Sequence, residues 1–285
     1  MRTRASIALL LPLAFLIGCA VPTSPTTQTT ASTSITGNWQ IQSGSAITSP
    51  PTVPYLAGAL QGTDTALTGT FSTAQSSTVS PVVESYSGTY NATTGSMVLS
   101  TTLPGQTIAT LAVPSNPTTL STGTLLFQCG LCNNGLSVPV VAAEIAPLNG
   151  TYTGTLSGTL TTGSQTTPIS GTASLTLTQS ATPSSSVQFP LTGTVTITSI
   201  SGLDAFTVSE ISGPSSLSGM VSGVTVVLGT PQPCIGPGGY PVCDSVLAGF
   251  MISANTNSTA TQITVSNLTY GATGSFSFTG TLTLQ

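Results

Sequence analysis

Carboxylates are the first residues of this chain to consider for chemistry, because two of them can hydrolyse a glycosidic bond when they lie about 5–9.5 Å apart. Asp204 and Glu210 are the closest pair in sequence. On one straight strand they would be about 20 Å apart, so a catalytic pair would need a turn between them. Scattered acids on a polar surface are the ordinary case. We therefore expect no enzyme, with a carboxylate-based hydrolase as the remaining catalytic alternative. The full set of acids is Asp64, Glu84, Glu144, Asp204, Glu210 and Asp244.

Most other catalytic groups are missing from the sequence. It contains no His and no Lys, and its two cationic side chains are Arg2 and Arg4. Nucleophiles activated by His or Lys, and Schiff bases on Lys, are therefore excluded. Nucleic acid is excluded as a partner, because nothing beyond residue 4 could neutralise phosphates. No calcium-binding repeat is present, and we expect neither a metal site nor a cofactor.

Four cysteines remain for structural chemistry: Cys129, Cys132, Cys234 and Cys243. In an oxidising envelope they indicate two disulfides, with three possible connectivities. Cys234 and Cys243 flank a Gly-rich turn, whereas Cys129 and Cys132 would be about 10 Å apart in a strand and need a tight turn to pair. Crossed pairing between the two groups stays open. A redox role would need a nearby cation or a helix N-terminus to lower the thiol pKa, and the spacing does not suit zinc.

Cys19 belongs to a different motif. Residues 5–17 form an apolar run after Arg2 and Arg4, too short to span a bilayer but suited to a signal peptide. Leu16-Ile17-Gly18-Cys19 then has the form of a bacterial lipobox. We expect residues 1–18 to be a lipoprotein signal peptide.

The membrane is then a partner through a lipid anchor on Cys19. Residues 19–34 are rich in Ser, Thr and Pro and should form a flexible tether. Ala20 is not the Asp that retains lipoproteins at the inner membrane. We expect a cell-envelope protein with an outer-membrane location favoured, its periplasmic or surface face left open.

Several segments carry a resemblance. The lipobox, the Thr-rich tether, the GNWQ opening at 37–40, PLNGTYTGTL at 147–156 and FPLTGTVTIT at 189–198 resemble uncharacterised Gly/Ser/Thr-rich lipoproteins of the acidobacterial type. That resemblance implies an envelope lipoprotein and brings no known activity or site residues. Gly37-Asn38-Trp39 is also similar to the G-x-W of the first lipocalin strand. It implies a Trp at the barrel floor, where lipocalins usually add a basic residue that this chain lacks.

The elements that must position these residues are strands. Only 3% of the residues are charged, so the usual helix surface cannot be built. Apolar and hydroxyl residues alternate instead over 173–178, 194–198 and 275–284, the pattern of half-buried antiparallel strands. We predict an all-β fold of hairpins, as barrels or sandwiches, with helix only in the signal peptide. A transmembrane barrel is not expected, because aromatics are only 5% and form no girdles.

An internal echo predicts two lobes. The segments 35–39 and 148–152 share an apolar residue, a polar one, Gly, a polar one and a large aromatic. We place β lobe 1 at 35–147 and β lobe 2 at 148–285, in contact with each other. The alternative is one large β domain over 35–285.

Two functions follow from this composition. The first is a non-enzymatic envelope module with structural, adhesive or surface-binding roles. Its partners would be glycans, envelope proteins or its own copies, the last through strand edges that lack protective Lys. The alternative is a lipocalin-like carrier of a small apolar ligand, which would need a sizeable dry cavity rather than a filled core. Without His or Lys, stability should be nearly flat from about pH 5.5 to 9.

Overall fold

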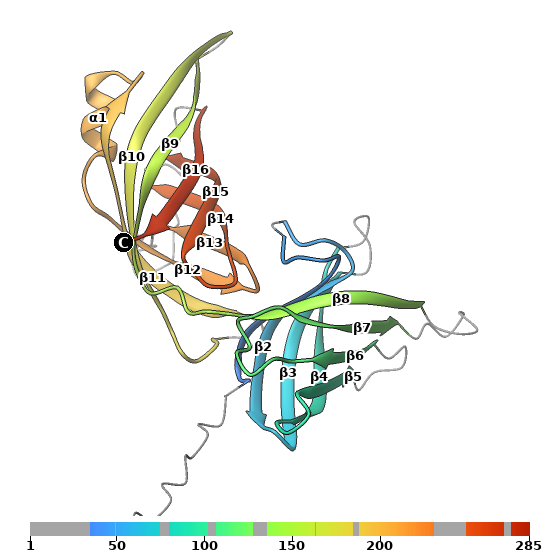
Figure 1. Cartoon of the computed structure of the whole chain (residues 1–285). Coiled ribbons are helices and arrows are strands. Elements are labelled where there is room, and N and C mark those ends of the chain that lie inside the picture. Colours follow the sequence, from blue (N-terminus) through green and yellow to red (C-terminus); the bar gives the residue numbers. More distant parts are fainter. Residues whose placement is uncertain are drawn as a thin grey trace, which may run out of the picture. The chain divides into compact units, whose positions relative to one another are not determined.

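The computed structural model describes residues 35–48, 50–74, 80–101, 107–127, 136–162, 164–184, 188–230, 249–270 and 275–285. In these residues the chain forms two closed antiparallel barrels of eight strands each (Figure 1). Both barrels belong to one compact unit, Thr33–Gln285. The predicted all-β fold and its two lobes are confirmed.

The first barrel is a meander that closes on itself. Each strand pairs with its neighbours in sequence, and β1 pairs with β8 from Asn38↔Ile145 to Ser43↔Val140. Closure leaves every described strand with two partners. Its strands are β1 (Gly37–Ser43), β2 (Tyr55–Thr63), β3 (Ala66–Ala74), β4 (Val82–Asn91), β5 (Ser96–Thr101), β6 (Thr107–Ala112), β7 (Ser121–Phe127) and β8 (Leu136–Ile145).

The second barrel repeats this order. Its last strand closes onto its first, from Ser275↔Thr161 to Leu284↔Tyr152. The connection from the first barrel runs from Ile145 to Gly150, and the expected division after Pro147 falls inside it. The strands are β9 (Gly150–Thr162), β10 (Gln165–Gln179), β11 (Phe189–Ser201), β12 (Ser215–Ser222), β13 (Thr225–Gly229), β14 (Phe250–Thr256), β15 (Gln262–Tyr270) and β16 (Ser275–Leu284).

Period-two patterning explains why these segments are strands. In β10, Ala173, Leu175 and Leu177 are buried, whereas Thr176 and Thr178 between and after them are exposed. Such alternation puts one face inside the barrel and a hydroxyl face outside. Each barrel has its own apolar core. The largest members are Trp39, Phe71, Tyr86, Tyr90 and Met97 in the first and Tyr152, Phe189, Phe250, Phe276 and Phe278 in the second.

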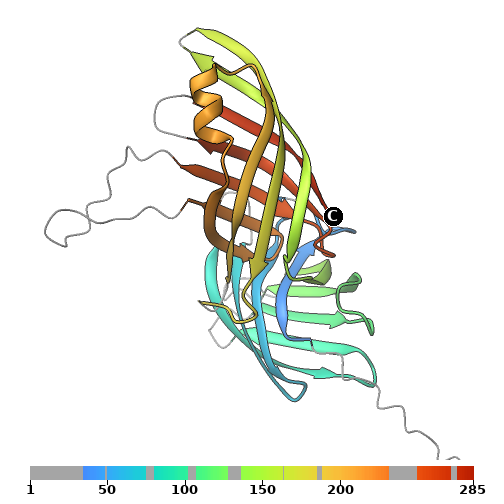
Figure 2. The same ribbon diagram turned by 90° about the vertical axis from the view of Figure 1, so that its left-hand side faces the viewer.

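One short helix departs from the expectation of helix only in the signal peptide. Helix α1 (Ala205–Ile211) follows β11 and lies beside the strands of the second barrel (Figure 2). Seven residues are too few for a helix that is stable alone, so packing must hold it. Ile211 supplies that packing, because it is fully buried in the core of the second barrel. Within the described residues, no helix combines the length and apolar character needed to cross a bilayer.

Barrel closure bears on the expected edge pairing between copies. Self-association by edge pairing needs a strand with unpaired backbone N–H and C=O groups. Both described barrels are closed, so each of their strands is paired on both sides. The pairing does not run the whole length of each strand, because β11 pairs with β12 over Phe189–Val195 but with β10 as far as Ser201. Edge pairing between copies therefore stays a prediction.

Candidate binding site where the two barrels meet

Polar side chains on the outer face of β1 are buried, which is unusual for the outside of a barrel. Trp39 and Ile41 face the interior, so Asn38 and Gln40 face outward, yet they are only 2% and 0% exposed. On the neighbouring strand, outward-facing Ala59 is also buried and belongs to the core cluster of the second barrel. The second barrel therefore packs against this face of β1 and β2.

The contact uses the turn between β12 and β13. The Asn38 side-chain amide donates from Nδ2 to the Gly223 carbonyl at 2.8 Å, and the Gly223 N–H donates to Asn38 Oδ1 at 2.6 Å. The Val224 N–H also donates to Gln40 Oε1 at 3.4 Å. The two hydrogen bonds of Asn38 satisfy both polar ends of its amide, each of which would cost about 1–3 kcal/mol if buried without a partner. Asn38 therefore binds the backbone of the β12–β13 turn through both ends of its amide. Gln40 Nε2 and Ser222 Oγ, in contrast, are buried without a hydrogen-bond partner among the described residues.

Gly223 suits this contact for two reasons. Its φ of 53° lies in the left-handed region that favours glycine. A Cβ at this position would also overlap Gln40 Oε1 and lie 2.9 Å from the Ala57 Cβ. Small residues on both sides thus allow the backbone of the second barrel to approach β1 and β2 closely. A second link is the hydrogen bond from the Ala146 N–H to the Ser258 carbonyl, at 2.8 Å.

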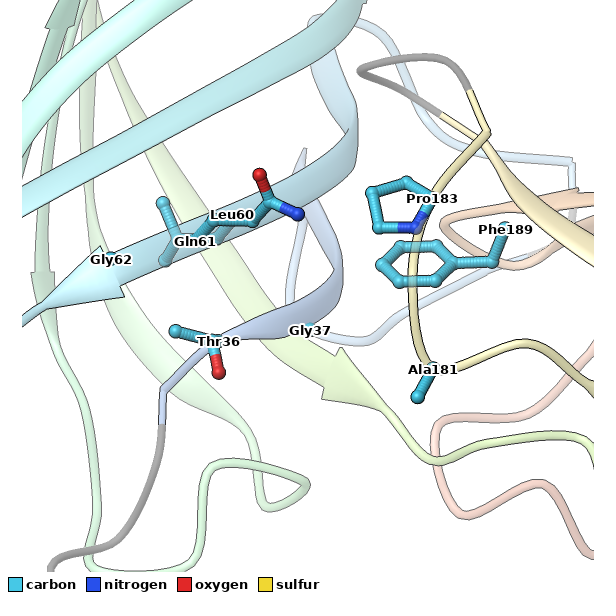
Figure 3. A pocket seen from close by; sticks show the side chains of 8 residues that line it. All are labelled: Thr36, Gly37, Leu60, Gln61, Gly62, Ala181, Pro183 and Phe189. Carbon is cyan, nitrogen blue, oxygen red and sulfur yellow. The ribbon is translucent and has the colours of Figure 1, made fainter.

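A pocket of about 300 Å³ opens beside this contact (Figure 3). The Gln61 side chain points across it toward Pro183 and Phe189. None of the described residues that line it has an ionisable side chain. The pocket offers the Gln61 amide, the Thr36 hydroxyl, small aliphatic and backbone surfaces and two rings. The lining residues are Thr36, Gly37, Leu60, Gln61 and Gly62 from the first barrel and Ala181, Pro183 and Phe189 from the second.

Trp39 lies at the inner end of β1, where its indole N–H donates to the Ile35 carbonyl at 2.9 Å. It is fully buried in the core of the first barrel, as expected of a core aromatic. The residue paired with it on β8 is Glu144. An acid is thus paired with this Trp, whereas lipocalins usually place a basic residue beside theirs.

Glu144 is held in an apolar setting at this end of the first barrel. Its carboxylate approaches Gly37 so closely that a Cβ on residue 37 would lie 2.5 Å from Oε1. Burial raises the pKa of Glu144 from 4.5 to about 7. Stability should therefore depend on pH inside the window from about 5.5 to 9 that was expected to be nearly flat, because burial moves the pKa of this acid into that window.

The other acids of the described residues lie in different elements. Glu84 accepts a hydrogen bond from the Tyr86 hydroxyl at 2.9 Å, and Asp64 lies in the turn between β2 and β3. Asp204 directly precedes α1 and Glu210 lies within it, so the chain turns between these two acids, as a pair of this spacing would require. Six residues of helix advance only about 9 Å along the axis. Among the described residues, no group of three or more potential metal ligands occurs.

The predicted sites at the cysteines cannot be placed. The predicted lipidation site Cys19 and the disulfide candidates Cys129, Cys132, Cys234 and Cys243 lie outside the described residues, as does Asp244.

The sequence did not predict the residues that line the pocket or join the barrels; it singled out only Trp39, which lies next to them. One signal could have identified Asn38 and Gln40. Both are amides at outward-facing positions of β1, where other strands such as β10 carry Ser or Thr.

The described residues that line the pocket have no ionisable side chain. Glu144, whose pKa burial raises to about 7, is paired with Trp39 at the end of the first barrel. Comparison of the chain with protein-family models, with curated proteins and with solved structures finds no significant match.

Proposed function

We propose that this chain is a non-enzymatic lipoprotein of the cell envelope, in which residues 19–34 tether two β-barrels to the outer membrane through Cys19. The barrels then serve a structural, adhesive or surface-binding role. The composition supports this proposal, because the tether precedes a body that lacks the usual catalytic side chains. Envelope glycans and proteins are the partners that an uncharged, hydroxyl-rich surface suits.

The observation that carries the proposal is the filling of both barrels. Trp39, Phe71 and Leu125 in the first barrel have 0% exposed surface, as do Tyr152 and Phe278 in the second. A water-sized void beside any of these side chains would give it exposed area. The space around them is therefore occupied by other side chains, which supports a rigid module.

The outer surface supports the same role. Threonines such as Thr172, Thr176 and Thr178 project from β10 and are exposed. Contacts made by such a surface use hydrogen bonds rather than charges, so they should change little with ionic strength.

A lipocalin-like carrier of an apolar ligand is the alternative, and Trp39 can test it. Trp39 is the only tryptophan and lies in the core of the first barrel. An apolar ligand entering that core must change its surroundings and hence its fluorescence. Titration with oleic acid should leave the Trp39 emission unchanged. A saturable shift or quench at micromolar ligand would contradict the module and favour the carrier.

The anchor is tested separately in a bacterial host. Full-length protein should incorporate labelled palmitate and sediment with outer membranes, whereas Cys19→Ser should do neither. Ala20→Ser, which keeps the cysteine, is the matched control and should behave like the wild type. Failure of the wild type to incorporate palmitate would overturn the lipoprotein assignment.

A further inference from the structure

The pocket beside the barrel contact has two chemically different walls. One wall is the end of β2 with Gln61, whose side chain is solvent-exposed. Its amide has no hydrogen-bond partner among the described residues and points across the pocket (Figure 3). The other wall consists of Pro183 and Phe189, whose rings lie next to each other in the connection from β10 to β11 and at the start of β11.

These walls select a class of ligand. A charged ligand would leave its charge unpaired, because none of the lining residues is ionisable, and that carries a high desolvation cost. A long acyl chain would not fit, since 300 Å³ is at the lower end of small-molecule pockets. A compact ring with an apolar face and a polar edge matches both walls. Neutral saccharides have this character, with C–H groups on the ring faces and hydroxyls around the rim.

The pocket is also built in advance. Gly37 lines it directly before Asn38, whose two hydrogen bonds to Gly223 join the barrels. The β10–β11 connection, which carries Ala181 and Pro183, is held by two backbone hydrogen bonds, from the Ser180 N–H to the Pro190 carbonyl at 2.9 Å and from the Ser184 N–H to the Gln188 carbonyl at 3.1 Å. Little conformational entropy should be lost when a ligand binds there.

We propose that this pocket binds a neutral saccharide unit, with the sugar ring packed mainly on half-buried Pro183, because only 4% of Phe189 is exposed, and with its hydroxyls hydrogen-bonded to the Gln61 amide. The inference rests on the proposed surface-binding role and names its ligand class and its site. A site formed by both barrels ties ligand affinity to the contact between them.

The test uses detergent-solubilised full-length protein and saturation-transfer NMR with glucose, galactose, mannose and N-acetylglucosamine. At least one sugar should receive magnetisation on its ring C–H protons, with a Kd of about 1 mM, as expected for a small uncharged ligand. Gln61→Ala should weaken binding about tenfold, because it removes the polar wall from an exposed position. Ala181→Trp should abolish binding by filling the pocket from a position that is also exposed.

Gln165→Ala is the matched control, since Gln165 is an exposed glutamine in the hairpin from β9 to β10 and does not line the pocket. It should bind like the wild type. Transfer to none of the four sugars would overturn the proposal, and so would equal binding by wild type, Gln61→Ala and Ala181→Trp. Palmitate incorporation at Cys19 is read independently, so loss of sugar binding with retained labelling refutes the pocket alone.

Discussion

Glu144 shows how burial can create a group that titrates near neutrality in a chain without histidine. Its pKa of about 7, raised from 4.5 by desolvation, means that the folded state holds a proton which the unfolded state has released. Between these two pH values the folded state binds more protons than the unfolded state. Stability must then fall as the pH rises from about 4.5 to 7, and must be level with respect to this group above that range.

We predict that Glu144→Gln removes this dependence. In the wild type the raised pKa should cost about 1–2 kcal/mol of unfolding free energy between pH 4.5 and 7.5, after allowance for the half-exposed side chain. Gln cannot ionise, so the variant should be more stable than the wild type at pH 7.5 and similar to it at pH 4.5. Urea unfolding at four pH values measures both curves, and their difference isolates Glu144.

Gln165→Ala provides the control, because it replaces an exposed side chain that cannot ionise. It should keep the wild-type slope between pH 4.5 and 7. Parallel curves for wild type and Glu144→Gln would show that the carboxyl does not bear the predicted desolvation.

The position of Glu144 was hard to predict for a physical reason. Strand periodicity reveals the inward face only when the opposite face is polar. In β8, Val140, Val141, Ala142 and Ala143 are all buried, so the two faces read alike in the sequence. The sequence identified Glu144 as one of six acids. It could not show the apolar surroundings of this acid, because these come from Gly37 and Trp39 on β1.

At the scale of elements, strands with one solvent-exposed face could be predicted from the sequence, whereas helix α1 could not. The hydroxyl face of β10 is exposed, so alternation over 173–178 predicted that strand directly. Helix α1 gave no such signal, because Ala205–Ile211 contains β-branched residues and is too short for helical periodicity. Its fold is decided by a tertiary contact, the burial of Ile211 in the second barrel.

We predict that Ile211→Ala lowers the free energy of unfolding by about 2–4 kcal/mol, the usual cost of truncating a fully buried aliphatic side chain. The loss should come from the second barrel and should free α1 from its strands. Denaturant unfolding gives the magnitude. Met220→Ala, at an exposed apolar position on β12, should change stability by no more than about 0.5 kcal/mol. Equal effects of the two substitutions would contradict the docking of α1 through Ile211.

At the scale of the whole molecule, two separate cores are joined by a small polar contact. Each barrel has its own apolar cluster, and Ala59 is the residue of the first barrel that enters the cluster of the second. The sequence echo at 35–39 and 148–152 predicted the two lobes. It could not predict how they join, because the hydrogen bonds of Asn38 reach a turn 185 residues away. A hydrogen bond between residues so far apart in sequence produces no periodic pattern in either segment.

The junction is tested by Gly223→Ala. The new Cβ would strain a residue at φ 53° and collide with Gln40, so the turn must move away from β1. We predict a loss of about 1–3 kcal/mol of unfolding free energy. Hydrogen exchange should quicken at the Gly223 and Val224 amides, which donate to Asn38 and Gln40.

Protection inside both barrels should persist in this variant, because the strand ladders do not depend on the junction. Gly213→Ala is the control, since a Cβ there meets nothing within 4 Å and the residue needs no left-handed backbone. It should exchange like the wild type. If Gly223→Ala instead left the amides of 223 and 224 protected, the amide side chains of β1 would not be what holds the barrels together. The pocket beside them would then owe its walls to another contact.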